Sequence, residues 1–117
     1  MEYMLMIYSS EKRWSAMTKA EAEQAMGAYR AYTEALQKAG VMKSGSRLRP
    51  SGDATTVRVA NGKSQVLDGP FADSKEQLAG YYLIDAPDLD AAISWASRCP
   101  GAGHGAVEVR PLWAPGT

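Results

Sequence analysis

Residues 68–85 carry the clearest structural pattern of this chain and read Asp68-Gly69-Pro70-Phe71-Ala72-Asp73-Ser74-Lys75-Glu76-Gln77-Leu78-Ala79-Gly80-Tyr81-Tyr82-Leu83-Ile84-Asp85. The Asp-Gly-Pro tripeptide reverses the chain. The following residues combine carboxylates, a hydroxyl, an ammonium and an aromatic ring, which is typical of a functional loop. From Leu78 onward the segment is strongly apolar, which predicts a buried strand. The pattern is therefore a chemically rich turn that leads into a central strand.

A second apolar run, residues 3–8, matches the strand at 78–85 and predicts another strand that is covered on both faces. Thr18 and Glu21 have the spacing of a capping box, and Gly40 is the expected left-handed stop of the helix that follows. Asp88 is the expected N-cap of a second helix that ends at Cys99, with Leu89, Ala92, Ile93 and Ala96 on its inner face. Further strands are predicted at residues 41–49, 55–59, 64–67 and 106–113, and the first helix at 19–39.

Asn61-Gly62 is a strong hairpin signal between the strands at 55–59 and 64–67. Without this hairpin the order of elements is β-α-β-β-α-β, which is the ferredoxin-like α+β arrangement with the two apolar strands at its centre. The whole chain, residues 1–117, is predicted to be a single domain. Two helices can cover only one face of the sheet, so we expect a second copy to cover the other face and form a homodimeric α+β barrel.

The composition excludes several classes of function. Thirteen basic residues balance thirteen acidic ones, and the chain has no Lys/Arg run, so direct nucleic-acid binding is not expected. The apolar start, residues 3–8, is too short to span a bilayer and has no signal-peptide features. A single cysteine, Cys99, excludes an internal disulfide and favours the cytoplasm. One histidine and one cysteine make a metal site or another cofactor unexpected. A chain of this size does not easily enclose a large cavity alone, so a second subunit is expected to help build any pocket.

Asp68 and His104 are the candidate catalytic residues. Asp68 follows a predicted strand and could act as a base or an orienter, or it could only hydrogen-bond its own turn. His104 is the only histidine and the natural acid–base partner at neutral pH, although it could also be an inert loop residue. A pocket beside the Asp68–Phe71 loop would bring the two side chains together.

Five further residues are candidate ligand-binding groups. Arg47 could recognise an anion, and Tyr82 has the polar-tipped ring that small pockets use. Glu108 and Arg110 share one face of the last strand, where they could bind a carboxylate or form a structural ion pair. Phe71 could be a stacking platform or an anchor for the loop.

The run Asp68-Gly69-Pro70-Phe71 resembles the signature of the YCII-related (DGPF domain) family of bacterial proteins, with Asp73-Ser74 where Glu-Thr is common. Residues 3–8, 79–84 and 105–111 also resemble the strands of that family. The resemblance implies the ferredoxin-like fold and the dimeric barrel. Many YCII-related sequences use a His–Asp pair with the histidine in the first helix region. The predicted helix at 19–39 contains no histidine, so that pair is not carried over.

Three functions are compatible with these observations. The first is a small-molecule enzyme or binding protein that uses Asp68. The second, implied by the resemblance, is a regulatory protein that acts with extracytoplasmic-function sigma factors, beside which relatives are often encoded. The third is a structural dimer whose motif only locks the loop, in which case the polar groups of the motif should be spent on backbone hydrogen bonds.

Overall fold

The structure is a computed structural model that describes residues 1–115. The last two residues of the predicted tail, 116 and 117, lie outside this range. The main elements are β1 (Glu2–Ser9), α1 (Glu11–Ser15), α2 (Lys19–Lys38), β2 (Met42–Arg47), β3 (Thr55–Ala60), β4 (Lys63–Asp68), β5 (Gln77–Asp85), α3 (Leu89–Arg98) and β6 (Ala106–Pro111). Short 3-10 turns, η1 (Ser51–Asp53) and η2 (Pro100–Gly103), lie between them.

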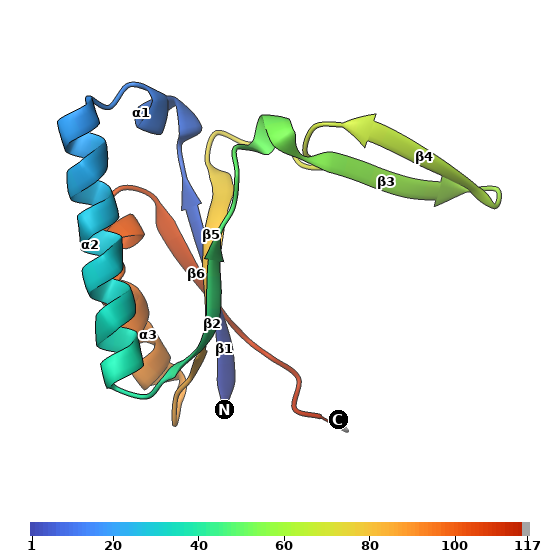
Figure 1. The fold of residues 1–117 in the computed structure, drawn as a ribbon. Coiled ribbons are helices and arrows are strands. Elements are labelled where there is room, and N and C mark those ends of the chain that lie inside the picture. The colour runs from blue at the N-terminus through green and yellow to red at the C-terminus, as the bar shows by residue number, and fades with distance from the viewer. Residues whose placement is uncertain (116–117) are drawn as a thin grey trace.

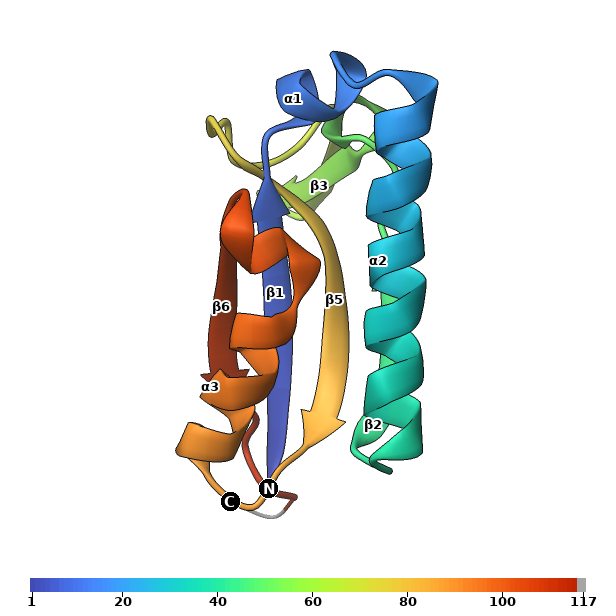
Figure 2. The same ribbon diagram turned by 90° about the vertical axis from the view of Figure 1, so that its left-hand side faces the viewer.

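Four strands form one antiparallel sheet in the order β2-β5-β1-β6. The prediction that the two most apolar strands lie at the centre is therefore confirmed, because β5 and β1 are the inner pair. Both long helices lie on one face of the sheet, with α3 over β6 and β1 and α2 toward β2 (Figure 2). The mixed α+β class predicted from the sequence is confirmed, and the opposite face of the sheet carries no helix (Figure 1).

The predicted helix signals act as expected. The Thr18 side chain accepts a hydrogen bond from the Glu21 amide, and the Glu21 side chain accepts one from the Thr18 amide, which completes the capping box. Gly40 has a φ of 71° directly after α2, and the Asp88 side chain accepts from the Ala91 amide at the start of α3. No helix within residues 1–115 is long and apolar enough to cross a membrane.

One element was not predicted, and one prediction differs from the structure. Between the predicted strand at 3–8 and the predicted helix at 19–39 lies the five-residue helix α1, which Ser10 caps by accepting a hydrogen bond from the Arg13 amide. On α3, Ala92 and Ala96 are buried as expected, whereas Leu89 and Ile93 are about half exposed. The buried side of α3 is thus its alanine stripe.

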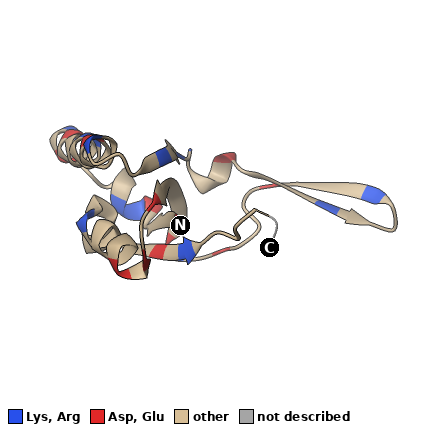
Figure 3. Cartoon of the chain, turned by 90° about the horizontal axis from the view of Figure 1, so that it is seen from below, with Lys and Arg blue, Asp and Glu red and all other residues tan. Residues whose placement is uncertain are grey.

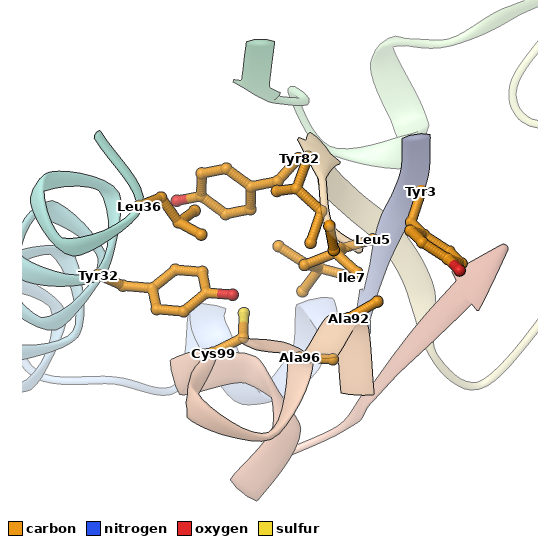
Figure 4. Packing of buried hydrophobic residues seen from close by; sticks show 11 residues of the cluster. Tyr3, Leu5, Ile7, Tyr32, Leu36, Tyr82, Ala92, Ala96 and Cys99 are labelled. Carbon is orange, nitrogen blue, oxygen red and sulfur yellow. The ribbon is translucent and has the colours of Figure 1, made fainter. Parts of the chain in front are cut away.

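The core lies between the helices and the sheet (Figure 4). Leu5, Leu36 and Ile84 are fully buried. The ring of Tyr32 from α2 meets the ring of Tyr82 from β5 edge to face, with centroids 5.3 Å apart, and the Tyr32 hydroxyl donates to the backbone oxygen of Trp95. These contacts link α2, β5 and α3 into one packed unit.

Strands β3 and β4 form a separate antiparallel ribbon, which we call the arm (residues 55–68). Its turn is Asn61-Gly62, and both residues have positive φ, as a type I′ turn requires. The arm projects from one end of the sheet on the side opposite the helices (Figure 1). It gives the chain extents of 47 × 47 × 19 Å, so the molecule is an L-shaped plate rather than a sphere.

Candidate ligand-binding site

A cavity of about 550 Å³ lies between α2 and the β2–β5 side of the sheet, with α1 at one end. This volume lies within the range of small-molecule sites. Residues of the one described chain line this cavity, and a contribution from a second subunit stays a prediction. Its walls are residues Ile7, Ser9, Glu11, Trp14, Ser15, Met26, Tyr29, Arg30, Thr33, Glu34, Met42, Gly45, Ser46, Arg47, Leu48, Arg49, Pro50, Ala79, Gly80, Tyr81 and Tyr82.

The floor of the cavity is built by strand register. Arg47 on β2 lies opposite Gly80 on β5, and Gly80 lies opposite Ile7 on β1. In the next row Gly45 faces Tyr82, whose ring lies so close that a Cβ on Gly45 would come within 2.8 Å of it. Two glycines therefore leave the floor without side chains at these positions, and the Tyr82 ring can lie flat beside β2.

The long wall is one face of α2. Met26, Tyr29, Arg30, Thr33 and Glu34 line the cavity, and their spacing of three and four residues places them on one stripe of the helix. The Thr33 and Tyr82 hydroxyl oxygens are 2.8 Å apart and share one hydrogen. The acceptor of such a pair keeps its own O–H, so the pair still offers one donor to a ligand.

The end wall is α1, and Glu11 fixes its position. The Glu11 carboxylate accepts hydrogen bonds of 2.6 Å from both the amide and the hydroxyl of Ser51 on η1. The Glu11 amide donates to the Gln77 side chain at the start of β5. These bonds hold Trp14 of α1 at the cavity, and they give each oxygen of the Glu11 carboxylate one hydrogen-bond donor.

Arg30 and Arg47 both line the cavity without an ion pair among residues 1–115, and Arg47 is the one of the two that stacks on an aromatic ring there. Its guanidinium carbon lies 5.5 Å from the centre of the Trp14 ring, within the range of a cation–π contact. Arg49, which also lines the cavity, is paired with Asp53 at 3.0 Å. Within residues 1–115, Arg47 forms no ion pair, so its five N–H donors remain for solvent or a ligand.

The Tyr29 and Tyr82 phenols at the cavity remain protonated at physiological pH, because both pKa values are raised. Burial raises the pKa of Tyr82 above its usual range, and burial, with smaller contributions from nearby Cys99 and Tyr82, raises that of Tyr29. A protonated phenol can donate a hydrogen bond to a ligand oxygen. The arrangement thus combines an exposed guanidinium, a hydroxyl pair and aromatic walls, which suits a flat ligand with an anionic group.

The predicted site residues divide into two groups. Arg47 and Tyr82 line the cavity. The other five lie outside its lining, namely Asp68, Phe71, His104, Glu108 and Arg110. Asp68 ends β4 at the base of the arm, and His104 follows η2 before β6; both side chains are exposed. Their pairing as acid and base stays a prediction, and none of residues 68–71 lines this cavity.

The remaining candidates make contacts of their own. Glu108 and Arg110 form an ion pair on β6, opposite Met6 and Met4 on the helix-free face of the sheet, so the structural pairing that the sequence left open is present. Phe71 is 73% exposed, so it does not anchor the loop in the core, and Arg58 of the arm stacks on its ring at 4.8 Å.

The Asp68–Gln77 motif uses several polar groups internally. The Ser74 hydroxyl donates to the Glu76 carbonyl, and the Gln77 side chain donates to the Ser74 carbonyl. The Gly69 backbone is bonded to Ala54 and to the Thr56 hydroxyl. Bends at residues 71–72 and 75–76 shape this loop. These hydrogen bonds stabilise the conformation of the loop, as the structural interpretation of the motif requires.

Several cavity residues were not singled out from the sequence, above all Trp14, Tyr29 and Thr33. The signal was present on α2, where the hydroxyl-bearing side chains of Tyr29 and Thr33 lie four residues apart and therefore on one face of the helix. Trp14 had no such signal, because α1 is too short to show periodicity.

Comparison with known proteins agrees with this fold. The family model of the YCII-related domain matches residues 1–114. A Rhizobium meliloti (strain 1021) protein, "Uncharacterized protein R00369", is 40% identical over 114 residues, which cover 96% of this chain and 92% of that protein. The structure of 5-chloro-2-hydroxyhydroquinone dehydrochlorinase (TftG) from Burkholderia phenoliruptrix AC1100, in complex with 2,5-dihydroxybenzoquinone, is similar with a TM-score of 0.56 at 18% identity, covering 99% of this chain and 96% of that one. This chain therefore belongs to the YCII-related family.

Proposed function

We propose that this protein binds a small planar organic anion in the cavity between α2 and β2–β5. It acts either as a binding protein for this anion or as an enzyme that transforms it. The observation that carries the proposal is Arg47, a guanidinium that stacks on Trp14 at the cavity and forms no ion pair within residues 1–115. The anionic group would meet Arg47, and the ring would lie over the glycine floor near Tyr82. The hydroxyl pair of Thr33 and Tyr82 would bind a second oxygen of the ligand.

TftG supports the choice of a first probe. It is an enzyme, and the compound in its structure, 2,5-dihydroxybenzoquinone, is a small planar ring with several oxygens. A compound of that shape fits the chemistry of this cavity. The acid–base role predicted for Asp68 and His104 is not part of the binding proposal, because both side chains are exposed and lie outside the lining.

Calorimetric titration with 2,5-dihydroxybenzoquinone, benzoate and uncharged benzamide tests the proposal. We expect at least one of the two anions to bind, and Arg47→Gln to weaken that binding by tenfold or more. Arg98→Gln is the matched control, because Arg98 also stacks on a tryptophan, at 4.4 Å from Trp95, but lies outside the cavity lining. It should leave the affinity unchanged.

Three results would overturn this assignment. Equal anion binding by the wild type and Arg47→Gln would remove Arg47 from the site. Loss of binding in Asp68→Asn, with Arg47→Gln unaffected, would move the site to the Asp68–Phe71 loop. Absence of binding by all three probes would remove this ligand class, and the predicted sigma-factor association would then be the function to test.

We also infer that the protein is a homodimer through the helix-free face of the sheet. Met4, Met6 and Tyr8 of β1 project to this face, and Tyr81 and Leu83 of β5 lie opposite them. The chain exposes 8172 Å², whereas a compact protein of 12.6 kDa is expected to expose about 6,200 Å². The excess of roughly 2,000 Å² exceeds what one partner buries in a standard interface, about 800 Å². Sedimentation equilibrium should give about twice the chain mass.

A further inference from the structure

The three valines of the arm share one face, and the other face carries Arg58, Gln65 and Lys63 together with Leu67. The pairing of β3 with β4 places Val57 directly opposite Val66, and Val59 lies on the same face. The next pair, Arg58 opposite Gln65, lies on the other face. This alternation is typical of a ribbon that buries one side. In the single chain the valine side is not buried, because Val57, Val59 and Val66 are 60%, 69% and 62% exposed.

The arm receives little support from the rest of its own chain: Arg58 stacks on the exposed Phe71 ring, and the Gly69 backbone is hydrogen-bonded to Ala54 and Thr56 at the base. Within residues 1–115, β3 and β4 pair only with each other and form a sheet of their own. A two-stranded hairpin is marginally stable at best in water, and three strands or a packed hydrophobic face are normally needed. A partner that covers the valine face would supply the missing packing.

The geometry of the arm fits one particular partner. It points away from the helices, on the side of the free sheet face (Figure 1). Each strand has six residues, so the arm reaches about 20 Å. A second sheet packed on the free face would lie about 10 Å away, and its helix layer about 10 Å further. The arm is therefore long enough to extend along the full thickness of a second copy of this chain.

The charges of the arm agree with this orientation. Seen from below, the arm is mostly uncharged, with two basic bands (Figure 3). They belong to Arg58 and Lys63, which the register places on the face opposite the valines. The face that carries Arg58 and Lys63 can therefore remain in water while the valine face packs on the partner.

We propose that the arm is a dimer clasp: Val57, Val59 and Val66 of one chain pack against the flank of the second copy, and the second arm does the same in return. This proposal rests on the homodimer proposed above and adds that the arm, and not only the sheet face, holds the two copies together. The reciprocal contact follows from two-fold symmetry, in which each surface is used twice.

The test compares two adjacent cross-strand pairs of the arm. Val57→Thr with Val66→Thr makes the valine face polar but keeps β-branched side chains, so the strands should persist. Arg58→Thr with Gln65→Thr is the matched control on the opposite face. Analytical ultracentrifugation over a dilution series should show the dimer dissociation constant raised at least tenfold by the valine pair and less than threefold by the control pair.

Hydrogen exchange separates a released arm from an unfolded protein. In the valine variant, amides of residues 55–68 should exchange faster, while those of β1 and β5 remain protected. If the wild type is a dimer and the valine pair leaves its dissociation constant unchanged, the clasp is wrong and the dimer stands. If the wild type is a monomer at all concentrations, the dimer and the clasp are both wrong.

Discussion

Gly105 shows how a single residue limits the packing between η2 and the sheet. A Cβ at this position would overlap the carbonyl oxygen of Tyr8 and approach the Glu76 carboxylate to 3.1 Å. Because the obstacle is backbone of the central strand β1, it cannot rotate away. The glycine is therefore required by close approach, not by an unusual φ.

We expect Gly105→Ala to destabilise the protein by about 1–3 kcal/mol, the usual cost of overpacking. Gly103→Ala in the same loop is the control, since nothing lies within 4 Å of a Cβ there. Urea unfolding monitored by circular dichroism measures both. Equal stability of the two variants would show that the loop moves freely away from β1.

At the scale of the element, the ends of α2 explain why this helix could be located from sequence. The capping box of Thr18 and Glu21 and the positive φ of Gly40 are local interactions, and the structure contains both. The hydrogen bond that the Glu21 carboxylate accepts from the Thr18 amide is the largest of the effects that lower the pKa of Glu21. The start of α2, which forms the long wall of the cavity, is thus fixed by two residues only three positions apart.

Removal of the cap by Thr18→Ala should cost about 1 kcal/mol of stability, because the Glu21 amide loses its acceptor. The Glu21 pKa should also rise toward 4.5 as the reciprocal cap loosens. NMR titration of Glu21 and thermal unfolding measure the two effects. Thr18→Ser keeps the hydroxyl and should restore most of both; if it behaves like the alanine variant, the hydroxyl is not the source of the stability.

At the scale of the whole molecule, the core contains several weakly acidic side chains, namely one thiol and three phenols. Burial raises the pKa of the Cys99 thiol and of the Tyr29, Tyr32 and Tyr82 phenols. Groups whose pKa is higher in the folded state stabilise that state fully at low pH. Above their unfolded values, 9.0 for the thiol and 10.0 for the phenols, the unfolded chain loses protons that the folded chain keeps.

The melting temperature should therefore fall as pH rises above about 9, with a steeper fall above about 10. Tyr32→Phe should lower stability at neutral pH, because it removes the hydrogen bond to Trp95, but it should flatten the alkaline fall. Melting curves from pH 7 to pH 11 provide the measurement. An unchanged alkaline slope in Tyr32→Phe would mean that this phenol ionises freely in the folded protein.

The sequence by itself determined the central strands β1 and β5, both ends of α2, the start of α3 and the Asn61-Gly62 turn. Each of these depends on residues within a few positions of one another: an apolar run, a cap or a left-handed glycine. The pairing of Glu108 with Arg110 was also open to sequence reasoning, since alternate strand positions share a face. Local signals of this kind remain valid whatever the rest of the chain does.

Only the tertiary structure decided where the candidate site lies. The chemically rich Asp68–Gln77 run suggested a pocket at its own loop, yet Trp14, Thr33, Arg47 and Tyr82 meet elsewhere, from α1, α2, β2 and β5. Their meeting depends on the register of β2 with β5 and on the Glu11–Ser51 bonds, which join residues 40 positions apart. A cavity formed by such long-range pairing leaves no local pattern, because no one segment contains enough of its walls.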